Sequence, residues 1–289
     1  MTGTAITRPA FIEIAVLGEL KLAISGEPVA IPPKAARLLC ELLAASGHAV
    51  LAGTLQRRLY GRDPDHRTGQ ALRRCVSDLR DILGGAIPPR DGRERVIFTR
   101  RIGAETGYGI NLNTIALDAT LFQQHAATAS GLMRDRHWTQ AVIRLETARC
   151  LWRGIPFTGI GDAAFAGTWK TRLLTAHQTA IGQHAEALIQ LDHVSEALQD
   201  LQAGAAAYPG NGRLWRLLML ALYVAERDSD ASQAAHDAIA SFREEGIDPP
   251  AAVLQLQQDL LGHRLPRQPG LALDAGGFAR PALPTAAAS

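Results

Sequence analysis

The sequence predicts an α+β winged helix-turn-helix domain followed by an all-α tetratricopeptide-like helical repeat domain. Three observations lead to this fold class. Short alternating apolar runs flank three helix-like segments in the first part of the chain. Strand signals end near residue 117, and alanine-rich helical periodicity then continues almost to residue 262. Within that second part, small and large residues recur in a fixed register.

The first domain is expected to contain strands, three helices and a hairpin, in that order. Residues 11–31 hold three short apolar runs broken by glycine, which predicts three antiparallel strands. Amphipathic helices should follow between Pro33 and Ser46, over 52–60 and over 68–83. Two further apolar runs, at 96–99 and 108–112, predict a hairpin that closes the domain.

The second domain fits the tetratricopeptide pattern, in which small residues let paired helices approach and large ones fill the groove between pairs. One unit has small residues at Ala197 and Gly204, a large one at Leu201 and a proline at Pro209. In the same register, the next unit has matching residues at Trp215, Leu218, Leu222, Ala231 and Ala238, with misfits at Met219 and Ala235. A generic helical bundle is the alternative interpretation.

These patterns set the expected domain boundaries. We expect a disordered N-terminus at 1–9, the winged-helix domain at 10–115, the tetratricopeptide-like domain at 116–263 and a disordered tail at 264–289. The aromatic residues of the second domain, Trp152, Trp215 and Tyr223, are predicted to pack in the core rather than to form a ligand cage. The glycine-rich stretch 154–161 follows no strand, so we expect a connector between helices.

The charge distribution and the cysteines indicate which partners, cofactors and compartment to expect. Residues 1–115 carry 16 basic and 11 acidic residues, a net of +5, whereas the remainder carries 14 and 17, a net of −3. The basic N-terminal part suits nucleic acid, although a charge of this size also suits ordinary solubility. The cysteines, Cys40, Cys75 and Cys150, are far apart and form no paired metal motif, so no cofactor or metal is expected. Without a secretory or membrane-spanning apolar run, we expect a cytoplasmic protein.

The third predicted helix carries the candidate DNA contacts. In a helix-turn-helix the second helix of the pair enters the major groove. Its apolar stripe should leave polar side chains on the opposite face, at Gln70, Arg73, Arg74 and Ser77. Further candidates precede the helix, flank it or stand in the hairpin, at Arg67, Arg80, Arg100 and Arg101. A solvated helix face is the alternative interpretation of the same residues.

Two acidic residues oppose this prediction. Asp78 and Asp81 should share the exposed face and repel phosphate. Asp78 lies four residues after Arg74 and could neutralise it. Asp81 falls in the last turn, where we expect it to lie outside the groove.

The chain resembles the Streptomyces antibiotic regulatory protein family, whose members join a response-regulator-type winged helix to a bacterial transcriptional activation domain. The resemblance covers about residues 10 to 262. Its most specific elements lie in the second domain, at Leu117-Asp118, Leu151-Trp152-Arg153-Gly154, Tyr208-Pro209, 218–223 and Gly246-Ile247-Asp248-Pro249.

This resemblance implies an activator that binds direct repeats at promoters as adjacent copies, recruits RNA polymerase and often controls secondary-metabolite genes. Family members commonly carry basic residues where Asp78 and Asp81 stand, so the resemblance does not extend to the strength of DNA binding or to the target sequence.

Three functions are compatible with these features of the sequence. The first is a DNA-binding transcriptional activator whose partners are double-stranded DNA, RNA polymerase and a second copy on DNA. The second is a protein-interaction adaptor whose winged helix has lost DNA binding. An enzyme is the third and has the least support, because the nine histidines are dispersed and the chain holds no HExxH, GxSxG or P-loop motif.

Overall fold

The computed structural model describes residues 11–84, 95–160 and 164–278. The chain divides into two compact units, and each is described by itself. The first unit contains residues up to Gln123 together with Cys150–Leu174, and the second contains Gln124–Arg149 and the chain from Thr175 onward. The N-terminal residues expected to be disordered lie outside the described residues.

The first unit begins with a four-stranded sheet in the order β3-β2-β1-β7. Its strands are β1 (Ile12–Ala15), β2 (Lys21–Ile24), β3 (Glu27–Pro28) and β7 (Ile115–Leu117). The three predicted antiparallel strands are confirmed. The fourth strand, β7, runs parallel to β1 and was not predicted, because three residues before a helix give too short a pattern to recognise.

Three helices follow, α1 (Pro33–Ala44), α2 (Ala52–Tyr60) and α3 (His66–Gly84), and all three predicted helices are confirmed. Pro33 opens α1 in the first turn, where its missing N–H leaves no hydrogen bond unmade. Gly61 ends α2 in the left-handed conformation, with φ of 65°. Glu41 of α1 is buried and pairs with Arg58 of α2 at 2.9 Å, which joins the first two helices.

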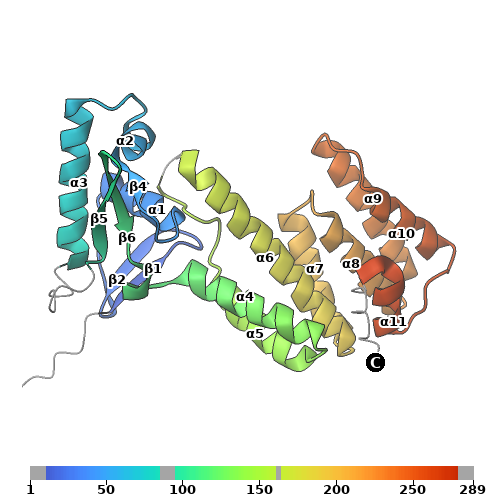
Figure 1. Ribbon diagram of the computed structural model, residues 1–289. Coiled ribbons are helices and arrows are strands. Elements are labelled where there is room, and N and C mark those ends of the chain that lie inside the picture. Colours follow the sequence, from blue (N-terminus) through green and yellow to red (C-terminus); the bar gives the residue numbers. More distant parts are fainter. Residues whose placement is uncertain (1–10, 85–94, 161–163, 279–289) are drawn as a thin grey trace, which may run out of the picture. The chain divides into compact units, whose positions relative to one another are not determined.

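The predicted hairpin is confirmed and forms part of a second sheet in the order β4-β6-β5. Its strands are β4 (Val50–Leu51), β5 (Ile97–Ile102) and β6 (Glu105–Ile110), and a short 3-10 helix, η1 (Leu112–Thr114), follows. Gly109 leaves space for the Phe98 ring of the paired strand, which would lie 2.3 Å from a Cβ at that position. In Figure 1, α3 lies alongside this hairpin.

A helical array makes up the rest of the chain. Two helices contain the points in the sequence at which the units divide, α4 (Asp118–Arg134) and α6 (Ala164–Gln190). The other helices are α5 (Trp138–Cys150), α7 (Val194–Ala207), α8 (Gly212–Val224), α9 (Asp228–Glu244) and α10 (Ala251–Leu261). All eight residues placed in the repeat register within these helices are buried: Ala197, Leu201, Gly204, Trp215, Leu218, Leu222, Ala231 and Ala238. Gly204 leaves space for Ile181, which would lie 3.0 Å from a Cβ at that position.

The connector between α5 and α6 belongs to the first unit. The N–H groups of Arg153 and Phe157 donate to the carbonyls of Leu17 and Val16, at 2.8 and 3.1 Å. Asp118, at the start of α4, accepts hydrogen bonds from the N–H groups of Val16 and Leu17 and pairs with Arg153 at 2.8 Å. The expected domain boundary at residue 115 therefore falls inside a connected structure.

Residues 264–278 differ from the disordered tail expected from residue 264 onward. They form α11 (Pro269–Leu273) and a further helical turn (Asp274–Phe278), and they bury Leu273 and Phe278 in the core around α8. We name residues 264–278 the C-terminal clasp. Its prolines and glycines leave only short apolar stretches without a helical period, so the sequence did not predict its anchoring residues. The remainder of the expected tail lies outside the described residues.

Candidate nucleic-acid interface

Helix α3 presents a polar face on the side opposite its buried stripe. Leu72, Val76, Leu79 and Leu83 are buried, with exposures of 0 to 2%. The four side chains predicted to point the other way are exposed: Gln70, Arg73, Arg74 and Ser77. Arg67 is also exposed, in the first turn of the helix rather than ahead of it. A cationic helix face of this kind can donate hydrogen bonds to phosphates and base edges.

The N-terminal end of α3 is fixed by a reciprocal cap. The Thr68 N–H donates to Asp65 Oδ1 at 2.6 Å, and the Asp65 N–H donates to Thr68 Oγ1 at 3.0 Å. The bond from the Thr68 N–H, and after it the Thr68 hydroxyl 2.8 Å from Asp65 Oδ1, lower the pKa of the Asp65 carboxyl group. Thr68 Oγ1 also lies 2.9 Å from Gln56 Oε1 of α2, which connects the two helices of the pair. The spacing Asp-x-x-Thr is a capping signal that the sequence reasoning missed.

Arg80 binds the hairpin rather than facing solvent alone. Its Nε donates to the Ile97 carbonyl at 3.3 Å and its Nη2 donates to Thr99 Oγ1 at 2.6 Å. Both acceptors belong to β5, so the side chain holds the hairpin against α3. The sequence placed Arg80 on the flank of the helix as a candidate DNA contact, and in the structure its guanidinium is hydrogen-bonded to β5.

The two predicted hairpin arginines lie on opposite faces of β5. Successive side chains of a strand alternate, so Arg101 shares the face of Thr99, which contacts α3 through Arg80. Arg100 lies on the other face and lines a cavity of about 500 Å³ together with Phe98 and Arg95. Only Arg101 of this pair lies on the α3 side of the strand, and Arg95 is a neighbouring cation that sequence reasoning missed.

The two acidic residues of α3 are exposed, as predicted. The ion pairs found in the described part of the chain do not include Arg74 with Asp78, so the expected neutralisation is not made in the free protein. Asp81 lies within the last turn of α3, which ends at Gly84. Asp78 is therefore the carboxylate closest to the exposed arginines along the helix.

The described ranges hold neither a metal-binding cluster nor a helix suited to a membrane. No group of three or more histidine, cysteine, aspartate or glutamate side chains there is placed to hold a metal ion. None of the helices in that part of the chain has the length and apolar character that a bilayer crossing requires.

Comparison with known proteins gives one domain family and several regulators. The bacterial transcriptional activator domain model matches residues 117–261. Regulatory protein AfsR of Streptomyces griseus is 29% identical over 230 residues, which are 79% of this chain and 22% of AfsR. Transcriptional regulatory protein EmbR of Mycobacterium tuberculosis is 28% identical over 253 residues, 86% of this chain and 63% of EmbR. This chain thus spans less than two thirds of either relative.

A shorter relative and a solved structure extend the comparison. Transcriptional regulator RedD of Streptomyces coelicolor is 28% identical over 257 residues, 86% of this chain and 70% of RedD. The structure of Mycobacterium tuberculosis EmbR in complex with a low affinity phosphopeptide has a TM-score of 0.79 at 24% identity, over 93% of this chain and 70% of that one. This likeness shows a shared fold. Because the domain model matches half of the chain, the protein belongs to the bacterial transcriptional activator domain family, and its resemblance to the Streptomyces antibiotic regulatory proteins is confirmed.

Proposed function

We propose that the protein is a DNA-binding transcriptional activator whose first unit is a winged helix-turn-helix. In this proposal α2 and α3 form the helix-turn-helix, α3 enters the major groove, and the β5–β6 hairpin is the wing. The observation that carries it is the exposed face of α3, where Arg73, Arg74 and Gln70 stand opposite a fully buried stripe. The names of the relatives, which are regulatory proteins, support the same function.

The proposed contacts divide by chemistry. Arg67, Arg73 and Arg74 would neutralise phosphates or bind guanine edges, and Gln70 and Ser77 would contact base edges. Arg101 would contact the backbone or minor groove beside α3, whereas Arg100 lies on the far face of the wing. Asp78 would lower affinity by repelling phosphate, because no ion pair with Arg74 neutralises it in the described structure.

The helical unit is proposed to act as a tetratricopeptide-like platform that contacts RNA polymerase. The buried register of small and large residues in α7, α8 and α9 supports this architecture. Family membership supports binding to direct repeats by two adjacent copies in the cytoplasm, upstream of genes such as a biosynthetic cluster.

The test is selection of bound genomic fragments by the purified protein, followed by salt titration of any enriched site. We expect a repeated motif and a steep fall in affinity with salt. Arg73→Ala and Arg74→Ala should weaken binding and reduce the salt slope, by about one for each lost phosphate contact. Arg243→Ala removes the same charge from an exposed position on α9 and should change neither property. Binding without sequence enrichment, or equal losses in all three variants, would contradict the proposal.

The exposed carboxylates of α3 favour a second candidate, an adaptor whose winged helix no longer binds DNA. Replacing Asp78 and Asp81 with arginine separates the two functions. The double variant should bind an already enriched site more tightly if the protein is an activator. It should acquire DNA binding that the native chain lacks if the protein is an adaptor.

A further inference from the structure

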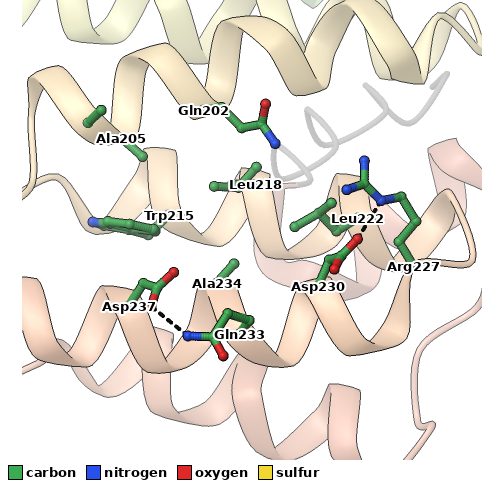
Figure 2. Close-up of a pocket in the computed structure, with 11 residues that line it drawn as sticks. Gln202, Ala205, Trp215, Leu218, Leu222, Arg227, Asp230, Gln233, Ala234 and Asp237 are labelled. Atoms are coloured by element: carbon green, nitrogen blue, oxygen red, sulfur yellow. Dashed lines mark hydrogen bonds and ion pairs between the residues drawn. The ribbon is translucent and has the colours of Figure 1, made fainter.

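A groove lies in the second unit between α7 and α9, with α8 as its floor, and we name it the α7–α9 groove. It has a volume of about 340 Å³. Figure 2 shows the α8 side chains Trp215, Leu218 and Leu222 along the floor, with α7 and α9 on either side. The groove belongs to a different unit from the proposed DNA interface, so its role is independent of DNA binding.

The sequence explains why the groove is hollow. Trp215, Leu218 and Leu222 follow one another at spacings of three and four residues, which places them on one face of α8. The walls that rise beside them carry small side chains, Ala205 on α7 and Ala234 on α9. Small walls on either side of a large apolar floor leave space that a side chain from another molecule can enter.

Of the two carboxylates along the α9 wall of the groove, one has a cationic partner in the groove and the other has a neutral one. Arg227 Nε lies 2.6 Å from Asp230 Oδ2, so this guanidinium is already paired. Asp237 Oδ1 accepts one hydrogen bond from Gln233 Nε2 at 2.8 Å, and this partner is neutral. Among the residues that line the groove, two carboxylates therefore face one guanidinium, and Asp237 is the carboxylate without a cation there.

The uncompensated carboxylate lies at the Trp215 end of the groove. Figure 2 shows Trp215 and Asp237 at one end and Arg227 with Asp230 at the other. The indole is held in place, because Trp215 Nε1 donates to the Pro209 carbonyl at 2.8 Å. Trp215 lines the groove with 8% of its surface exposed, and an aromatic ring beside a carboxylate favours a guanidinium or ammonium group.

A different part of α8 is already occupied by the chain itself. The C-terminal clasp binds there: Tyr223 Oη donates to the Leu265 carbonyl at 3.0 Å, and Arg216 lies 4.7 Å from the centre of the Phe278 ring. These residues do not line the α7–α9 groove. These clasp contacts therefore involve α8 residues other than those that form the floor of the groove.

We propose that the α7–α9 groove is a docking site for a basic side chain of a protein partner, with arginine preferred over lysine. The guanidinium would lie against the exposed part of the Trp215 ring and pair with Asp237, and its aliphatic stem would lie along Leu218. Arginine is favoured because its planar group can stack and donate two hydrogen bonds at once. Glutamine side chains on both walls, Gln202 and Gln233, offer further acceptors at the rim.

The experiment is an NMR titration of the full chain with N-acetyl-arginine methylamide, observing the indole N–H of Trp215 after its assignment with Trp215→Phe. N-acetyl-citrulline methylamide is the matched probe, since it has nearly the same shape without the charge. We expect saturable shifts with the arginine probe and binding about fivefold weaker with citrulline, as a cation–π contact and an exposed ion pair would give.

Two variants locate the effect. Asp237 is exposed, so Asp237→Asn should fold normally and lose the preference for arginine. Glu244→Gln removes the same charge from an exposed position of α9 outside the groove and should keep it. Absence of a saturable shift, equal binding of the two probes, or an unchanged preference in Asp237→Asn would overturn the proposal. None of these outcomes bears on DNA binding, which is tested separately.

Discussion

Asp118 is expected to contribute strongly to the stability of the first unit. Its carboxylate accepts hydrogen bonds from Val16 N–H at 2.8 and 2.9 Å and from Leu17 N–H at 3.0 Å. Val16 and Leu17 are fully buried, so water cannot replace the carboxylate as their partner. Arg153 pairs with the same carboxylate and is one-third exposed, so it would remain solvated after the loss of Asp118.

The magnitude of Asp118→Ala follows from these contacts. Leaving a buried backbone N–H without a partner costs about 1–3 kcal/mol, and two are left here, which gives a loss of about 4 kcal/mol. The exposed Arg153 pair adds little, because ion pairs of this kind contribute about 0–1 kcal/mol before screening is considered. Asp118→Asn keeps one acceptor oxygen but directs an NH₂ group at an N–H, so we expect roughly half of that loss.

The assay combines denaturant unfolding with hydrogen exchange of the Val16 and Leu17 amides. Asp118→Ala should lower the free energy of unfolding of the first unit and speed exchange at both amides. Asp135→Ala, an exposed position just after the same helix, is the control and should change stability by less than about 0.5 kcal/mol. The reasoning fails if the two variants unfold alike or if exchange at these amides is unaltered.

Three further changes test how α3 and the hairpin are held. Thr68→Val should destabilise the first unit by about 1 kcal/mol in denaturant unfolding, since it keeps the shape but loses the capping oxygen. Because the pKa of Asp65 is lowered in the folded chain, its cap stabilises the fold above pH 3.8, and this stabilisation is lost as the pH falls further. The denaturant midpoints of Asp65→Ala and of the native chain should therefore converge in acid. Gly109→Ala should cost about 1–3 kcal/mol, because its Cβ meets the Phe98 ring.

Each of these three predictions has an outcome that would contradict it. A Thr68→Val variant as stable as the native chain would show that the cap contributes nothing. Unfolding midpoints that stay apart at low pH would mean that Asp65 acts by something other than its charge. For Gly109→Ala, native stability would require the Phe98 ring to move freely, and Gly131→Ala is the control, because its new Cβ meets only the tip of Arg134.

The sequence predicted the elements that depend on local periodicity. The helices at 33–44 and 52–60 and the hairpin have strong patterns with glycine or proline at their ends, and these signals are local. The parallel pairing of β7 with β1 and the bonds of Asp118 join residues about a hundred positions apart, which no local pattern contains. The C-terminal clasp was missed for a related reason, since its anchors pack on α8 from outside the repeat register.

The candidate DNA interface shows the same division between local and distant information. Helical geometry correctly predicted that the α3 side chains at positions 70, 73, 74 and 77 are exposed, because they lie opposite the buried stripe. The same geometry could not show that Arg80 binds β5, nor that strand alternation separates Arg100 from Arg101.

That separation changes the design of any mutational test of DNA binding. Replacing Arg100 and Arg101 together would remove one cation beside α3 and one from the cavity on the other face of the hairpin, so a loss of binding could not be assigned to either. Replacing Arg80 would remove a charge and also a hydrogen bond that holds the hairpin. A loss of DNA binding could then come from a displaced hairpin or from a lost DNA contact. Single substitutions at Arg73 and Arg101 avoid both problems, because neither side chain is bonded to a neighbouring element in the described structure. The decrease in salt slope of each variant, relative to the native chain, therefore shows whether that arginine neutralises a phosphate.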